Sequence, residues 1–267
     1  MNDFLRRYGT WGLIAGSAEG LGESFSRTLA TRKMNLVMVD HKDDVLKKLA
    51  EEIENKYGIK TRTLVLDLAG QDSADIIMNA VQDLDCRLMV YNAAYSQVKP
   101  FLKNTAEDLD NYVNVNTRSL IRLTLPFSIR CRDAGSGGIL IMSSLAGLWG
   151  SRMIGPYGAT KAFGCVLAES LHHELKAYGI DVMACIAGAT ATGAYLATEP
   201  KYSWPRPNVM MPDIMAEEAI RHLGKKVFYV PGLANRINYF ILTRILSRKM
   251  AGTLFNRTTV KMYRDKI

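Results

Sequence analysis

A turn with three glycines, placed directly after an apolar run, is the feature that most limits how this chain can fold. Residues 11–14 form the run, and Gly16, Gly20 and Gly22 precede a helix-like segment. Glycine takes positive φ and leaves the backbone bare, while a helix N-terminus offers unpaired N–H groups and a positive dipole end. The pattern therefore predicts a strand, a tight turn and a helix that bind a dinucleotide pyrophosphate. A turn that only packs closely would also favour glycine, so further residues must decide.

The length and the charge distribution narrow the class of protein. We expect 267 residues, of which 48% are hydrophobic, to form a single domain over 1–267 with a buried core. The net charge of +8 belongs to the end of the chain: residues 1–200 hold 21 Lys and Arg against 22 Asp and Glu, and residues 201–267 hold 13 against 4. The part with the glycine turn lacks a basic field, which argues against nucleic acid as a partner.

The termini, cysteines and histidines suggest a cytoplasmic protein without a metal site. The N-terminus lacks the charge order of a signal peptide, and Arg244 interrupts the apolar run near the C-terminus. His172 and His173 are neighbours on an expected helix and cannot share a metal ion. The cysteines have no CxxC pair and read as small core residues of a reducing compartment; they are Cys86, Cys131, Cys165 and Cys185.

Short apolar runs alternate with longer helix-patterned stretches. Such runs are typical of strands covered on both faces, as in a parallel sheet between two helix layers. The fold class is therefore doubly wound α/β, and we interpret residues 193–223 as a substrate-loop region because a long loop in a compact domain usually serves function. The runs lie at 11–14, 36–39, 64–66, 88–91, 139–142, 182–186 and 226–230, and the clearest helices at 43–57, 156–178 and 213–223.

Tyr157 and Lys161 are the strongest candidates for chemistry. They stand four residues apart in the expected helix 156–178, so both side chains leave the same face. Ser144 follows the run 139–142, at the strand edge where open α/β sheets bind ligands. Tyr95 and Lys99 have the same spacing, but the residue that stands as far before Tyr95 as Ser144 stands before Tyr157 is Gln82, which has no hydroxyl.

Taken in chain order, the motifs resemble those of the short-chain dehydrogenase/reductase family over residues 11–192. The family's glycine turn corresponds to residues 15–22, its Asn-Asn-Ala-Gly segment to residues 91–94, its adenine-contacting Asp to Asp67 and its helix Asn to Asn116. The resemblance implies a single Rossmann-type domain with a parallel sheet of about seven strands and helices on both faces. It also implies a nicotinamide cofactor bound by Gly16, Ala18, Glu19, Gly20, Leu21, Asp40, Asp67, Leu68, Asn92, Ala93, Ala94, Tyr157, Lys161, Gly188, Thr190 and Thr192.

The resemblance implies that Tyr157 exchanges a proton with an alcohol while the nicotinamide exchanges a hydride at the same carbon. A phenol with a pKa near 10 is a weak base at neutral pH, so we expect the Lys161 cation to lower the pKa of Tyr157. Lys161 would also hold the cofactor ribose. Ser144 would orient the substrate oxygen, and Asn116 would keep a water that connects Lys161 to solvent.

The acidic residue at the end of the second apolar run favours NAD over NADP as the cofactor. Asp40 can accept both ribose hydroxyls and repels a 2′-phosphate, and Glu19 stands where phosphate-selecting family members tend to carry a basic residue. His41 and Lys42 follow directly and offset part of this repulsion.

The expected substrate is a hydrophobic secondary alcohol or ketone, such as a sterol-like, alicyclic or acyl compound. Segments that surround the substrate in the family supply bulky apolar side chains, although such residues also fill cores. The candidates are Tyr95, Trp149, Met153, Tyr195, Tyr202, Trp204, Met210 and Met211. Direct contact is expected from Ser144, Trp149, Tyr157 and Tyr195.

Residues 232–267 are expected to form a basic helical extension. In this segment Ile237, Phe240, Ile241, Ile245 and Leu246 alternate with Arg236, Arg244, Arg248 and Lys249, a pattern typical of a basic amphipathic helix. Packing on the domain or on a partner subunit is the favoured interpretation, and contact with an anionic membrane surface is the alternative. The family resemblance implies a homodimer or homotetramer.

A second function stays open at this point. Tyr91, Ala94 and Ala187 depart from the family's usual residues, which suits a catalytically idle NAD-sensing protein whose basic tail contacts a partner or a membrane. The intact set of Asn116, Ser144, Tyr157 and Lys161 favours the enzyme.

Overall fold

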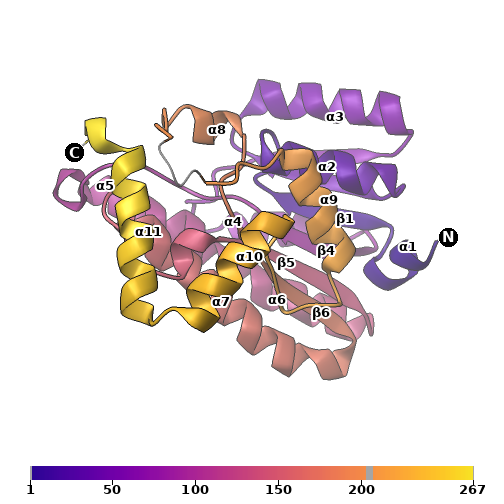
Figure 1. Ribbon diagram of the computed structural model, residues 1–267. Coiled ribbons are helices and arrows are strands. Elements are labelled where there is room, and N and C mark those ends of the chain that lie inside the picture. Colours follow the sequence, from indigo (N-terminus) through magenta and orange to yellow (C-terminus); the bar gives the residue numbers. More distant parts are fainter. Residues whose placement is uncertain (1, 203–206, 267) are drawn as a thin grey trace.

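Every apolar run of the sequence contributes a strand to one parallel sheet (Figure 1). The computed structural model describes residues 2–202 and 207–266, and the sheet has the strand order β3-β2-β1-β4-β5-β6-β7. The strands are β1 (Trp11–Ala15), β2 (Asn35–Asp40), β3 (Thr61–Val65), β4 (Cys86–Tyr91), β5 (Gly137–Ser144), β6 (Ile180–Ala187) and β7 (Phe228–Tyr229). The expected doubly wound fold is confirmed.

Two helix layers cover the sheet, and alternate residues of each strand face one or the other. In β2, Leu36 and Met38 pack toward the layer of α2 (Leu21–Thr31), α3 (Asp43–Tyr57) and α9 (Pro212–His222), whereas Val37 and Val39 face the opposite layer. That layer consists of α4 (Ser73–Ala80), α6 (Ser119–Asp133) and α7 (Gly155–Leu175). Burial on both faces explains why the strands read as continuous apolar runs.

Helix α3 occupies the expected residues, and the expected helix 156–178 is α7 followed by a 3₁₀ turn at Lys176–Tyr178. Helix α1 (Asp3–Tyr8) was not expected from the sequence. It is held by a distant contact, because Arg7 Nε (2.5 Å) and the Tyr8 hydroxyl (2.7 Å) both donate to Asp181 Oδ2. The remaining helices are α5 (Ala106–Val113), α8 (Gly193–Leu196), α10 (Leu233–Phe240) and α11 (Arg248–Met262).

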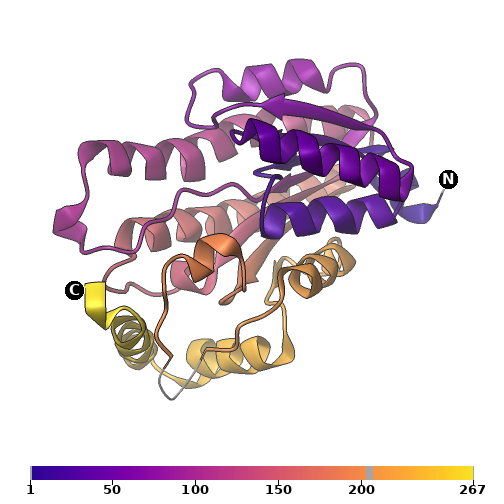
Figure 2. The same cartoon turned by 90° about the horizontal axis from the view of Figure 1, so that it is seen from above.

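The C-terminal extension forms two helices and not the single helix expected through residue 249. Helix α10 continues into a π turn at Ile241–Ile245, and the backbone is extended at Leu246. The Ser247 side chain then accepts from the Met250 N–H and caps α11. Figure 2 shows both helices on one side of the molecule, beyond α8. No helix within residues 2–202 and 207–266 is long and apolar enough to cross a bilayer.

Candidate active site

A cavity of about 1030 Å³ lies at the carboxyl ends of the central strands. Residues after β1, β2 and β4 line one part of it, and α8 and α11 line another. Ligands of open α/β sheets bind at this edge, where the strand order reverses between β1 and β4. The volume slightly exceeds the usual range for one drug-sized ligand, so the cavity has room for a dinucleotide and part of a second molecule.

The glycine turn leaves no space for side chains. A Cβ on Gly22 would lie 1.9 Å from the Gly16 carbonyl oxygen, and a Cβ on Gly16, whose φ is +79°, would lie 2.7 Å from the Cα of Ala93. Gly20 precedes α2 and gives it no side-chain cap. The bare turn and the uncapped helix N-terminus together match what a pyrophosphate requires.

The segment after β4 is locked onto this turn. The backbone N–H groups of Asn92 and Ala93 donate to the Ala15 carbonyl (3.0 and 2.8 Å), and Asn92 Nδ2 donates to the Gly16 carbonyl (2.7 Å). The buried Tyr91 hydroxyl donates to the Val115 carbonyl (2.6 Å). The unusual Tyr91 therefore serves as an internal anchor, and its departure from the family pattern has a structural reason.

Three charged side chains gather at the end of β2. Asp40 Oδ2 accepts from the Ala18 N–H (2.9 Å) and its Oδ1 from the Lys42 N–H (3.2 Å). Lys42 Nζ lies 2.5 Å from a Glu19 carboxylate oxygen, so this cation is paired. Two carboxylates and one paired lysine thus line this end of the cavity.

Nearly all residues assigned to the cofactor lie on the cavity wall, which holds Gly16, Glu19, Gly20, Leu21, Asp40, Asp67, Leu68, Asn92, Ala93, Ala94, Tyr157, Lys161, Gly188, Thr190 and Thr192. Ala18 lies behind the wall, where its N–H supports Asp40. Asn235 of the C-terminal extension packs closely against Gly188: a Cβ on Gly188 would lie 2.8 Å from Asn235 Nδ2.

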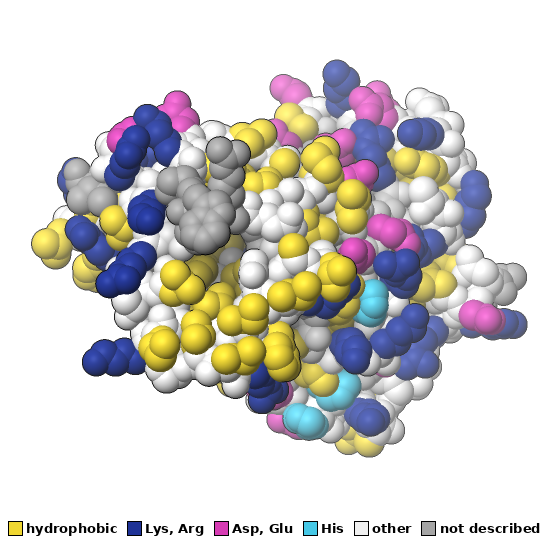
Figure 3. Space-filling view, viewed as in Figure 1, with side chains coloured by type: hydrophobic (Ala, Val, Ile, Leu, Met, Phe, Trp, Pro, Cys, Tyr) yellow, Lys and Arg dark blue, Asp and Glu magenta, His cyan; other side chains and the backbone are white. Residues whose placement is uncertain are grey.

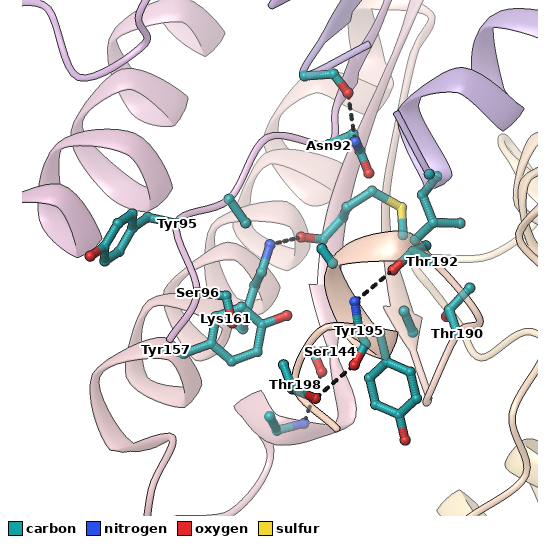
Figure 4. A pocket seen from close by; sticks show the side chains of 18 of the residues that line it. Asn92, Tyr95, Ser96, Ser144, Tyr157, Lys161, Thr190, Thr192, Tyr195 and Thr198 are labelled. Atoms are coloured by element: carbon teal, nitrogen blue, oxygen red, sulfur yellow. Dashed lines mark hydrogen bonds between the residues drawn. The ribbon is translucent and has the colours of Figure 1, made fainter. Parts of the chain in front are cut away.

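Tyr157, Lys161 and Ser144 meet in the cavity (Figure 4). Tyr157 and Lys161 extend from the first turns of α7, and Lys161 Nζ lies 5.7 Å from the centre of the Tyr157 ring. Ser144 ends β5, and its Oγ accepts from the Ala146 N–H (3.2 Å). The other pair with this spacing is not equivalent, since the Tyr95 hydroxyl is turned away toward Asp108.

Burial dominates the acid–base properties of the pair. It lowers the pKa of Lys161 to about 8, and the ammonium donates to the Met142 carbonyl (2.8 Å). Burial raises the pKa of Tyr157, and the hydrogen bond with Ser144 acts in the opposite direction. The expected net lowering of the Tyr157 pKa is not found for the protein chain alone, because removing the phenolate from water disfavours its charged form.

Asn116 lies beside the cavity wall and not on it. It sits in a π turn at Asn114–Arg118, and its Oδ1 accepts from the Tyr95 N–H (2.7 Å). Both N–H bonds of its amide are used, toward the Tyr95 carbonyl and Thr160 Oγ1 (2.9 Å each). The amide nitrogen has no further proton to give to a relay water. Asn116 therefore ties the segment after β4 to α7 between Tyr157 and Lys161.

The expected substrate residues divide into two groups. Tyr95 and Tyr195 line the cavity, and the Tyr195 hydroxyl accepts from Tyr202 (3.1 Å). Trp149 is buried against Phe255, with ring centres 5.9 Å apart, because α11 covers it. Trp204 lies outside the described residues. The remaining candidates do not reach the wall; these are Met153, Tyr202, Met210 and Met211.

Helix α11 supplies wall residues that the sequence did not reveal, namely Phe255, Thr258, Thr259, Met262 and the following Tyr263. The contacts that hold it there span about 60 residues of sequence. Thr198 and Tyr263 share a hydrogen bond (3.1 Å), and the Lys201 N–H donates to the Met262 carbonyl (2.9 Å). No local pattern signals such contacts.

Among the described residues, none that lines the cavity is a cysteine. The four cysteines are buried and unpaired, as the sequence suggested. In the parts of the chain that the structure describes, no group of three His, Cys, Asp or Glu side chains is placed to hold a metal ion.

Comparison with known proteins agrees with the motifs and the fold. The family model for short chain dehydrogenases matches residues 10–202. A 7β-hydroxysteroid dehydrogenase of Clostridium sardiniense is 28% identical over 234 residues, which are 88% of this chain and 90% of that protein. A very-long-chain 3-oxoacyl-CoA reductase of Bos taurus is 29% identical over 223 residues, which are 81% of this chain and 69% of that protein.

Two solved structures show the same architecture. A structure concerned with 7β-hydroxysteroid dehydrogenase stereoselectivity has a TM-score of 0.86 at 27% identity and covers 95% of this chain and 99% of its own. A short-chain dehydrogenase from Sphingobium yanoikuyae in complex with NADPH has a TM-score of 0.77 at 27% identity and covers 88% and 93%. From its motifs, its fold and the matched family model, this chain belongs to the short-chain dehydrogenase/reductase family.

Proposed function

We propose that this protein is an NAD(P)-dependent oxidoreductase that interconverts a hydrophobic secondary alcohol and its ketone, with Tyr157 as general acid and base. The observation that carries the proposal is that Tyr157, Lys161 and Ser144 meet in the cavity that begins at the glycine turn. A bound nicotinamide would supply the hydride chemistry. The turn fits such a group, since it can close this tightly only with glycine: a Cβ at Gly22 would clash with the Gly16 carbonyl oxygen at 1.9 Å.

The protein's own residues hold and move the proton. Ser144 donates a hydrogen bond to the substrate oxygen and fixes it near the Tyr157 hydroxyl. Lys161 attracts the phenolate: its Nζ lies 5.7 Å from the centre of the Tyr157 ring, and two unit charges about 6 Å apart interact by about 3 kcal/mol at an effective dielectric constant near 20. This attraction opposes the effect of burial and brings the phenol closer to the range of an effective base. Asn116 acts as a positioning residue that holds α7 against the segment after β4.

We infer that the cofactor is NAD in preference to NADP. Asp40 and Glu19 place two carboxylates at the adenosine end of the cavity, where they repel a 2′-phosphate. Lys42 could attract that phosphate, but it is paired with Glu19. The related Sphingobium yanoikuyae structure contains NADPH, so the preference needs a direct test.

Replacing Glu19 with Gln is expected to lower the ratio of kcat/KM for NAD over NADP about tenfold, because it frees Lys42 for the 2′-phosphate. Steady-state rates with each cofactor measure the ratio. Glu23→Gln is the matched control, since it breaks the pair with Arg27 on α2 outside the cavity. Equal ratios in all three proteins would refute a role for the Glu19–Lys42 pair in cofactor choice.

The substrate is proposed to be of steroid size or a long acyl compound. The cavity wall beyond Tyr157 includes Leu145, Ile154, Phe255 and Met262, which suit an apolar ligand. The relatives named above act on hydroxysteroids and 3-oxoacyl compounds, according to their names.

A panel of steroid, alicyclic and acyl alcohols and ketones, offered with NAD and NADP, tests the proposal. Turnover is followed by the absorbance of the reduced nicotinamide. We expect the highest kcat/KM with the bulky apolar compounds. Turnover of small polar sugars alone would contradict the proposed substrate class.

A further inference from the structure

Helix α10 and the π turn after it expose an apolar surface next to the cavity wall. We define the α10 surface as Leu233, Ile237, Phe240, Ile241 and Ile245, whose side chains are 38–67% exposed. They recur at helical spacing and therefore share one face. Figure 3 shows hydrophobic side chains gathered over this part of the molecule, with Lys and Arg at the margins. The domain therefore does not cover this face, which leaves a partner subunit or a membrane among the expected contacts.

The opposite side of α10 is firmly held. Asn235 is buried, and its Nδ2 donates to the Pro231 carbonyl (3.1 Å). Glu218 Oε2 of α9 accepts from the Gly232 N–H (2.9 Å) and lies 3.2 Å from an Arg236 nitrogen. The α10 surface is therefore presented by an anchored helix, which makes its exposure a stable property of the fold.

Basic residues follow the α10 surface. Among the residues the structure describes, no carboxylate lies within salt-bridge distance of Arg244, Arg248 or Lys249. The segment 232–266 contains one carboxylate, Asp265, and it pairs with Lys201. Two copies of this chain that met through this surface would bring like charges together, with no acidic side chain of the segment free to balance them.

We propose that the α10 surface binds an anionic lipid bilayer, with its apolar side chains at the acyl boundary and Arg244, Arg248 and Lys249 at the headgroups. An interface of this kind needs an apolar helix face and nearby cations, and the bilayer supplies the matching apolar layer and negative charge. The helix that follows, α11, contributes Phe255 and Met262 to the cavity wall. If the proposed function holds, lipid-dissolved substrate is thereby delivered beside the cavity.

The test is co-sedimentation of the full chain with vesicles of phosphatidylcholine alone or with about one-third phosphatidylglycerol. We expect binding to the anionic vesicles only. The variant Ile237→Gln/Phe240→Gln/Ile245→Gln should lower partitioning at least tenfold, and Arg244→Gln/Arg248→Gln/Lys249→Gln about 100-fold. The matched control replaces exposed apolar residues elsewhere and should bind like the parent: Val45→Gln/Ile76→Gln/Ile214→Gln.

Three results would overturn the proposal. The first is that the parent chain does not bind vesicles, and the second is that the apolar variant binds them as well as the parent. The third is that the apolar variant still binds vesicles but has a different oligomeric state in their absence, which would make the surface a subunit interface. Turnover of a water-soluble substrate is measured on the same samples. If the parent binds vesicles but shows no turnover, the proposed enzyme is refuted and the lipid-binding surface is supported. If the parent shows turnover but binds no vesicles, the lipid-binding surface is refuted and the proposed enzyme is supported.

Discussion

Tyr157→Phe is expected to lower kcat by about 10²–10⁴-fold while NADH still binds. The substitution removes one oxygen from a side chain in the cavity and leaves the ring in place. Proton transfer is lost because phenylalanine has no ionisable group, whereas the glycine turn and the end of β2 are untouched. Initial rates give kcat, and the fluorescence of bound NADH gives the dissociation constant.

Tyr178→Phe is the control for this loss. Tyr178 follows the same helix but is half exposed and does not line the cavity, so its hydroxyl should not affect turnover. Full activity in Tyr157→Phe would remove Tyr157 from the mechanism. If the parent chain binds NADH but turns over no compound of the panel, the alternative of a catalytically idle NAD-sensing protein replaces the enzyme.

Lys161→Met is expected to reduce kcat about 100-fold and to make the protein more stable at pH 7. The rate falls because the methionine no longer attracts the Tyr157 phenolate, an interaction worth about 3 kcal/mol for two unit charges about 6 Å apart. Stability rises because the parent buries a cation. The pKa of Lys161 is lowered from 10.5 to about 8, which corresponds to a cost of about 3 kcal/mol at neutral pH.

The direction of the pH effect follows from proton binding. Between about pH 8 and 10.5 the unfolded chain holds the Lys161 proton and the folded chain has released it, so this group's contribution to the free energy of unfolding rises with pH. Below pH 8 both states are protonated, and the full cost remains. The lost hydrogen bond to the Met142 carbonyl offsets about 1 kcal/mol, which leaves a net gain of about 2 kcal/mol for the variant at pH 7.

Urea unfolding of parent and variant at pH 7 and pH 10 measures this difference. The gain should shrink at the higher pH as the parent loses its buried charge. Lys48→Met, on the exposed side of α3, should change stability by less than about 0.5 kcal/mol. A Lys161→Met protein less stable than the parent at pH 7 would contradict the predicted cost of burying this cation.

Local patterns were enough to predict the sheet, the glycine turn and the placement of Tyr157 and Lys161. Each depends on a short stretch: an apolar run, bare backbone at Gly16 and Gly22, or two side chains one helical turn apart. Ser247 was also a local signal, because its side chain caps α11 at the Met250 N–H. It marks a break between two helices where a single C-terminal helix was expected.

Other features depended on contacts between distant segments. The direction of the Tyr157 pKa is set by burial, which no spacing reveals. Trp149 was expected at the substrate, but Phe255 covers it from a helix about 100 residues later. The role of Asn116 likewise follows from its partners Tyr95 and Thr160, which come from two other segments.

Because α11 forms part of the cavity wall but no part of the sheet, ligand preference can change independently of the proton-transfer residues. Randomising Phe255, Thr258 and Met262 would vary the shape of the wall and leave the backbone that supports Tyr157 and Lys161 as it is. Gene duplicates could diverge along the same route. The last helix is thus a natural module for engineering new selectivity into this scaffold.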